Sequence, residues 1–146
     1  MKKIVMFIMA MLVVASASTV SASAVSKPIE VYYNGSQIEF PDQQPLIYNG
    51  RTLVPVRMVA EALHFDVFWD NQKREVQIFK DQKFIFWTIG ESCYRTNNCV
   101  LIETECPATI ENGRTMVPLR FIAEQLGDIR VDFVSIDKCN MVLLYD

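Results

Sequence analysis

The sequence predicts an α+β fold, in which antiparallel strands and two short helices are built from an internal repeat. Three observations lead to this prediction. The phrase NGRTLVPVRMVAEAL begins at Asn49 and returns as NGRTMVPLRFIAEQL at Asn112, 63 positions later. Apolar residues inside each phrase follow helical spacing, and those after each phrase alternate with polar residues as in a strand. Each repeat unit is therefore expected to be a hairpin, a helix and a second hairpin.

The first 24 residues are expected to be a secretory signal peptide. A short basic start precedes an apolar run from Ile4 to Ala15, and small residues follow it. This order is typical of an export signal, and the apolar run is too short to span a bilayer. Cleavage is placed after Ala24, with Ala17 as the alternative site and an uncleaved anchor as the alternative outcome. Residues 25–146 then form one exported domain.

A tight hairpin is expected at the start of each unit. Residues 31–38 place Asn34-Gly35 between β-forming residues, which is a strong signal for a two-residue turn. The matching positions of the second unit carry Asn97-Asn98, a weaker turn sequence. The two units span about residues 29–79 and 92–145.

A helix of nine or ten residues follows in each unit. Pro55 and Pro118 suit a first helical position, where the missing N–H costs nothing. Gly127 is a good terminator for the second helix, whereas His64 holds the same place in the first and is a poorer one. The expected apolar stripes are Val56, Val59, Ala60 and Leu63, and Leu119, Ile122, Ala123 and Leu126.

Strands are expected after each helix and between the two units. In residues 65–70 one face carries apolar side chains and the other carries Asp66, Phe68 and Asp70, and residues 129–133 alternate apolar and charged side chains. Each segment leads through a polar turn to a further strand. Residues 83–89 add a linking strand. We expect an antiparallel sheet covered on one side by the two helices, with a rough internal two-fold.

The doubled phrases resemble a known family. NGRTLVPVRMVAEAL with DVFWD, then KFIFWTIG and NGRTMVPLRFIAEQLG, are similar to the copper amine oxidase N-terminal-like domain of secreted bacterial proteins. The resemblance covers residues 29–145. It implies a stalk-type domain that does not carry the catalytic centre, exported in many cases by Gram-positive bacteria.

The net charge and the cysteines limit the partners and the chemistry. The formal charge is −3, and removal of the basic start makes it more negative, which argues against nucleic acid or an anionic polymer bound through bulk charge. No membrane contact is expected after signal cleavage. Export permits disulfides, so two bridges of unknown pairing, or unbridged thiols, are the alternatives for the four cysteines. These are Cys93, Cys99, Cys106 and Cys139.

The sequence gives no support for an enzyme, a cofactor or a metal site. An amine oxidase centre requires three histidine ligands, and His64 is the one histidine of the chain. No nucleophile elbow and no phosphate-binding glycine loop is present. The expected catalytic and metal-ligand residues are therefore none.

Charged residues repeat with the phrases and form the expected structural brace. Arginine side chains have five donors and suit the anchoring of a turn, while an anion clamp is the functional alternative. The brace residues are Arg51, Arg57, Glu61, Arg114, Arg120 and Glu124.

Together these features predict a secreted, non-catalytic binding or scaffold module at the cell surface or in the medium. One alternative is an accessory module of a cell-wall-active enzyme that recognises glycan or peptide. Another is a self-assembling structural subunit. The expected partner is a cell-wall polymer or another surface protein, and the oligomeric state is not predicted.

Overall fold

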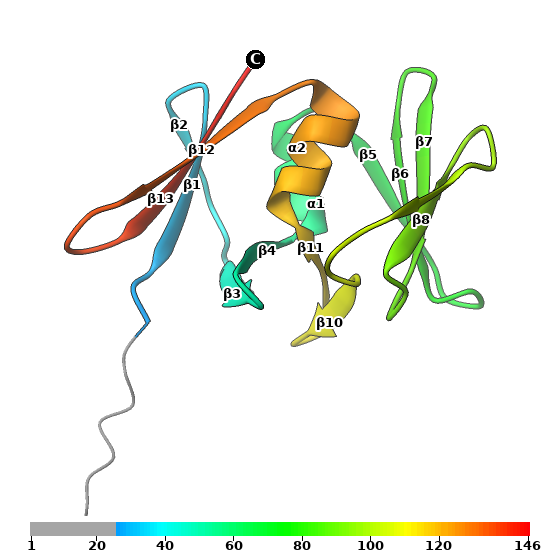
Figure 1. Ribbon diagram of the computed structural model, residues 1–146, viewed down its shortest axis with the longest axis horizontal. Coiled ribbons are helices and arrows are strands. Elements are labelled where there is room, and N and C mark those ends of the chain that lie inside the picture. Colours follow the sequence, from blue (N-terminus) through cyan, green and yellow to red (C-terminus); the bar gives the residue numbers. More distant parts are fainter. Residues whose placement is uncertain (1–25) are drawn as a thin grey trace, which may run out of the picture.

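The computed structural model describes residues 26–146, and the expected signal peptide with its cleavage site at Ala24 lies outside this part of the chain. The described residues form thirteen strands and two helices (Figure 1). The first repeat contains β1 (Ile29–Tyr33), β2 (Ser36–Ile38), β3 (Leu46–Tyr48), β4 (Arg51–Pro55), α1 (Val56–Ala62), β5 (Asp66–Asp70) and β6 (Glu75–Lys80). The remainder contains β7 (Lys83–Thr88), β8 (Cys93–Thr96), β9 (Leu101–Glu103), β10 (Thr109–Glu111), β11 (Arg114–Pro118), α2 (Leu119–Gly127), β12 (Arg130–Ser135) and β13 (Asn140–Tyr145).

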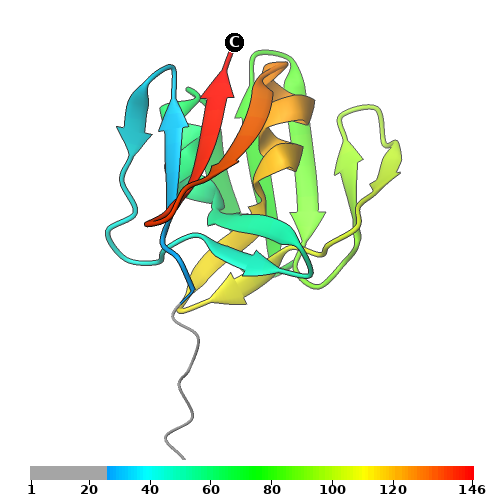
Figure 2. The same ribbon diagram turned by 60° about the vertical axis from the view of Figure 1, so that its left-hand side comes forward.

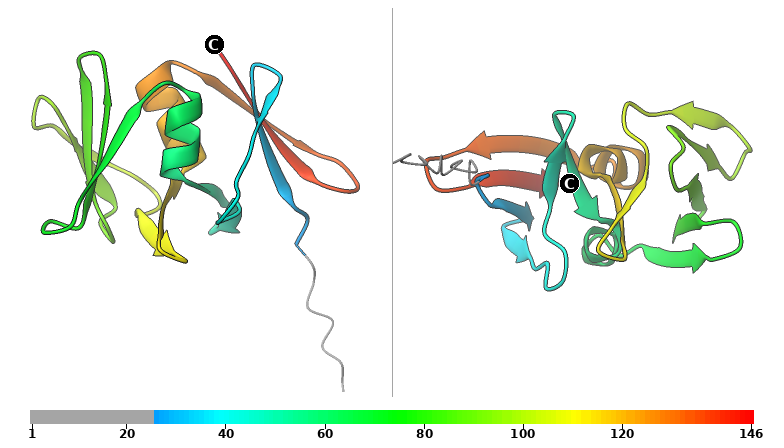
Figure 3. Two further views of the ribbon diagram at one scale, coloured as in Figure 1. Left: turned by 180° about the vertical axis from the view of Figure 1, so that it is seen from behind. Right: turned by 90° about the horizontal axis from the view of Figure 1, so that it is seen from below.

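The strands form three sheets around the helix pair. Sheet A has the order β12-β13-β1-β2, sheet B the order β10-β11-β4-β3, and sheet C the order β5-β6-β7-β8-β9. Figures 1 and 3 show α1 and α2 side by side between sheets A and C, with sheet B at one end of the helices. The buried apolar side chains of sheets A and C and of both helices belong to one main core.

The α+β class expected from the sequence is therefore wrong, because the molecule is a mainly-β sandwich with helices between its sheets. The expectation of purely antiparallel strands also fails, since β1 and β13 pair in parallel. Figure 2 shows these two strands adjacent, near the two ends of the described chain. Alternation in a sequence shows which residues share a strand face, but it does not show which strands pair or how many sheets result.

The two repeats meet about a local two-fold axis in the middle of sheet B. Strands β4 and β11 are antiparallel, and Val54 lies opposite Val117. These valines hold the same position in the doubled phrase, so the axis passes between them. Each is fully buried, which ties the repeated VP sequence to the contact between the units.

Sheets A and C each combine a hairpin from one repeat with a hairpin from the other. In sheet A, β12–β13 of the second repeat pairs with β1–β2 of the first. In sheet C, β5–β6 of the first repeat and β8–β9 of the second lie on opposite sides of β7. The repeats are thus interlocked, and the inserted β7 makes sheet C one strand wider than sheet A.

Each helix limit lies within about one residue of the expected one, although α1 has seven residues rather than the expected nine or ten, whereas α2 has nine. Pro55 and Pro118 are the N-cap residues, so each helix begins one position later than expected. The chain leaves α1 with His64 in the left-handed region, at φ 61°. In the second repeat α2 extends through Gly127, and Asp128 has φ 51° instead. The expected stripe of α1 is buried along its whole length.

The two initial hairpins differ in their turns. Asn34 and Gly35 both have positive φ, as the two-residue turn requires. The second repeat also turns at Asn97-Asn98, as expected, but the positive φ falls on Cys99, at 57°, and residues 97–100 join β8 to β9. Among residues 26–146, neither helix is long and apolar enough to cross a membrane.

Candidate functional site

The repeat produces two related cavities, which we call the first and second grooves. The first groove has a volume of about 650 Å³ and lies between the start of α1, the β5–β6 hairpin and the β10–β11 hairpin. The second groove has a volume of about 500 Å³ and lies between the start of α2, the β12–β13 hairpin and the β3–β4 hairpin. Each groove is lined by residues from both repeats, because the repeats interlock.

Equivalent side chains line the two grooves. Arg57 and Arg114 line the first, and the same phrase positions supply Arg120 and Arg51 to the second. An aromatic residue from the strand after each helix completes both walls, Trp69 in the first groove and Phe133 in the second. The doubled phrase is therefore both a fold unit and the source of two similar concave surfaces.

Two ion pairs connect the repeats in a reciprocal way. Arg51 of the first repeat pairs with Glu105 of the second. Arg114 of the second repeat pairs with Asp42 of the first. Both the arginines and the carboxylates hold equivalent positions, so these pairs obey the local two-fold. All four side chains are well exposed, so each pair is expected to contribute no more than about 1 kcal/mol.

The helix arginines differ between the grooves. Arg120 pairs with Glu124 on α2 at 3.6 Å between Nε and Oε1. Within the described residues, Arg57 and Glu61 form no ion pair or side-chain hydrogen bond with each other or with another group. Of the expected brace, Arg51 and Arg114 thus connect the repeats, Arg120 pairs on its own helix, and the Arg57 side chain has no partner among the described residues.

A third arginine, Arg74, also lines the first groove. It lies in the β5–β6 turn, and its side chain makes no ion pair or hydrogen bond within residues 26–146. The groove therefore holds three guanidinium groups and one carboxylate, that of Asp42. Two of these guanidinium groups have no partner in the described chain. No sequence pattern indicated Arg74, because it falls outside the doubled phrase.

The aromatic residues separate into those in the core and those on the surface. Trp87 is fully buried, with its ring centroid 4.5 Å from that of Phe121, and Tyr94 is also buried against Phe121. Trp69 remains 38% exposed in the first groove, beside Phe68, which is 57% exposed. The alternation in β5 identified the strand but not this exposure.

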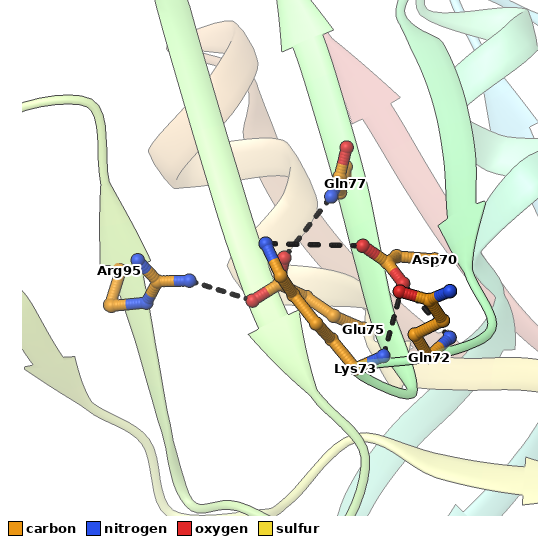
Figure 4. A network of polar contacts seen from close by, with 6 residues as sticks. All are labelled: Asp70, Gln72, Lys73, Glu75, Gln77 and Arg95. Atoms are coloured by element: carbon orange, nitrogen blue, oxygen red, sulfur yellow. Dashed lines mark hydrogen bonds and ion pairs between the residues drawn. The ribbon is translucent and has the colours of Figure 1, made fainter.

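The structure contains a buried charge that sequence reasoning missed. Glu75 at the start of β6 is 2% exposed, and its carboxylate accepts hydrogen bonds from Arg95 and Gln77 (Figure 4). Figure 4 also shows Asp70 at the end of β5, where its carboxylate pairs with Lys73 and accepts a hydrogen bond from the backbone N–H of Gln72. The Glu75 contacts connect β6 with β8, and they have the features of a structural support.

The cysteines and the single histidine do not form a site. All four cysteines are free thiols, and burial raises the pKa of both Cys106 and Cys139. In residues 26–146, no group of three or more histidine, cysteine or acidic side chains is arranged to hold a metal ion. The donor set of the described chain, with His64 alone at the end of α1, does not fit an amine oxidase copper centre.

Comparison with known proteins identifies related sequences. A family model described as the copper amine oxidase N-terminal domain matches residues 32–133. A protein from Brevibacillus choshinensis described as "Protease inhibitor" is 32% identical over 131 residues, which is 86% of this chain. The chain spans 39% of the length of that relative.

Proposed function

The chain belongs to the copper amine oxidase N-terminal domain family, and on this basis we propose that it is an exported, non-catalytic binding domain. It acts at the cell surface or in the medium, and its partner is a cell-wall polymer or another surface protein. The observation that carries this proposal is the first groove, where Arg57, Arg74 and the exposed Trp69 line one cavity. Concave surfaces with a few convergent polar groups are the usual binding sites of proteins.

Export is tested by expressing the full chain in a Gram-positive host and locating it. We expect the protein in the medium or on the cell surface, with a mature N-terminus at Val25 by mass spectrometry. Recovery only inside the cell, with residues 1–24 still attached, would argue against export.

Binding is tested by sedimentation of the purified domain with intact cells and with purified peptidoglycan, at low and high salt. The expected result is saturable sedimentation that weakens at high salt, because arginine contacts contribute to it. A protein that stays in the supernatant in every condition contradicts the proposal. Peroxide release from amines after copper addition would contradict the non-catalytic assignment.

A second candidate function is inhibition of an extracellular protease, and the name of the relative from Brevibacillus choshinensis favours it. This chain corresponds to less than half of that relative, so the inhibitory part is to be located experimentally. Secreted serine, cysteine and metalloproteases are assayed with increasing amounts of the domain. Stoichiometric loss of protease activity supports this candidate, and full activity at a large molar excess argues against it.

A further inference from the structure

The first groove follows the free edge of a sheet. β5 is a terminal strand of sheet C and pairs only with β6 among the described strands. Three consecutive residues of β5, Val67, Phe68 and Trp69, line the groove. Consecutive strand residues point to opposite faces of a sheet, so a cavity that touches all three extends along the strand edge, where main-chain donors and acceptors are unpaired.

The groove combines an apolar wall with cationic groups. Val67, Met58 and Ile110 contribute apolar surface, and Trp69 remains partly exposed beside them. The guanidinium groups of Arg57 and Arg74 have no partner in residues 26–146, whereas the Arg114 guanidinium is paired with Asp42. The chain as a whole carries a formal charge of −3, so two unpaired arginines in one cavity are a local excess of positive charge.

The second groove provides an internal comparison. It also lies beside a terminal strand, β12 of sheet A. Both of its arginines already have carboxylate partners, since Arg51 pairs with Glu105 and Arg120 with Glu124. The two grooves therefore share a shape and differ in free positive charge.

Building on the function proposed above, we infer that the first groove binds an extended acidic peptide, which adds to sheet C along the edge of β5. The main chain of the peptide pairs with the free edge, as in other strand-addition complexes. Its carboxylates pair with Arg57 and Arg74 through charge-assisted hydrogen bonds, and its apolar side chains pack on Trp69 and Val67. The second groove binds the same peptide weakly, because its arginines are already paired.

The probe for this inference is a short, end-capped peptide that alternates glutamate and valine. The purified domain is titrated with it while tryptophan emission is recorded. Of the two tryptophans, Trp69 is 38% exposed in the groove and Trp87 is fully buried, so the expected change in emission comes from Trp69. Trp69→Phe should remove this change, and fluorescence anisotropy of a labelled peptide then measures binding independently.

Three comparisons test the chemistry. Replacing the glutamates by glutamine should weaken binding at least roughly ten-fold, because charge-assisted hydrogen bonds are lost. N-methylation of alternate peptide bonds should also weaken it strongly, because it removes strand-pairing donors. The double variant Arg57→Gln/Arg74→Gln should lose roughly ten-fold or more. The matched control Arg51→Gln/Arg120→Gln makes the same charge change in the second groove and should lose less than about two-fold.

Several outcomes would overturn the inference. Equal losses in the two double variants would show that only overall charge matters. Full affinity of the N-methylated peptide would exclude strand addition, and tighter binding of oligogalacturonate would make the groove an acidic-glycan site. A cooperative urea unfolding transition in each variant verifies that it is folded. If the peptide does not bind but the domain still sediments with cells, this inference fails while the proposed binding function stands.

Discussion

The Arg95 Nη2 atom donates a hydrogen bond to the Glu75 carboxylate at 2.8 Å, and it does so across the inserted strand β7. Glu75 is almost completely buried, whereas the Arg95 side chain is 46% exposed. Removal of a partner from a buried carboxylate is costly, because the charge remains without compensation. The pair therefore connects β6 and β8 at the place where the inserted strand separates the two repeats.

Arg95→Met is expected to lower the free energy of unfolding by roughly 2 to 3 kcal/mol, at the low end for a buried pair because the arginine is half exposed. Glu75→Leu/Arg95→Met should recover most of this loss. Urea unfolding measures both variants. Arg130→Met on sheet A is the matched control, since Arg130 is exposed and forms no ion pair within residues 26–146; it should change stability by less than about 0.5 kcal/mol. Equal effects of Arg95→Met and Arg130→Met would contradict the assigned role of the pair.

His64→Gly is expected to stabilise the domain by about 0.5 to 1 kcal/mol, because His64 has φ 61° at the end of α1 and the left-handed region is unfavourable for a residue with a Cβ atom. Part of the gain is offset because glycine makes the unfolded chain more flexible. Thermal unfolding measures the change, and His64→Ala, which keeps the Cβ atom, should show no such gain. A lower melting temperature for His64→Gly would mean that the imidazole makes contacts that outweigh the backbone strain.

Tyr94→Phe is expected to leave stability unchanged or to raise it by up to about 1 kcal/mol. The Tyr94 hydroxyl is buried and has no hydrogen-bond partner among the described residues, and burial raises the pKa of this phenol. Phenylalanine retains the ring contacts with Trp87 and Phe121. Tyr94→Leu, which loses those contacts, should cost about 3 kcal/mol. A clear loss of stability in Tyr94→Phe would reveal a hydrogen-bonded water at this hydroxyl.

The sequence predicted the features that depend on short spacings. The stripe of α1, the turn at Asn34-Gly35 and the family all follow from residue order, because each depends on neighbours within a few positions. The assembly of three sheets could not be predicted in this way. Strands β3 and β10 have three residues each, which is too short for a visible alternation, and the β1–β13 pairing joins the two ends of the described chain.

The candidate site was only partly predictable for the same reason. The doubled phrase identified Arg57 and Arg114, but their roles differ because Asp42 lies beside Arg114 and no carboxylate pairs with Arg57 in the described residues. Arg74 comes from a turn that has no motif. Which arginine is free depends on how the repeats interlock, and a single sequence contains no local signal for that arrangement.

The reciprocal ion pairs should contribute little to stability. A double-mutant cycle of Arg114→Ala and Asp42→Ala is expected to give a coupling energy below about 1 kcal/mol, because both side chains are more than half exposed. The coupling should fall further in high salt. Arg57→Gln should change stability by less than about 0.5 kcal/mol, so a larger loss would support the brace interpretation for Arg57 and weaken its assignment to a ligand.

The thiols should differ strongly in reactivity, and the difference should depend on pH. Cys99 is exposed, whereas Cys106 is 1% exposed and packs against Leu53 and Met116. Burial raises the pKa of Cys106 above its ordinary value of 9.0. Because the thiolate is the reactive form, iodoacetamide at pH 8 should label Cys99 first and Cys106 only after unfolding.

The same pKa shift has a defined sign for stability. The folded state holds the Cys106 proton more tightly than the unfolded state does, so the protonated thiol contributes to the free energy of unfolding. This contribution is fully present below about pH 9 and is lost as the pH rises above that value. Cys106→Ala should therefore flatten the alkaline decline of the urea midpoint relative to the parent protein, whereas Cys99→Ala should leave it unchanged. Equal labelling rates for Cys99 and Cys106 at pH 8 would instead show that the small core around Leu53 opens readily in the folded protein.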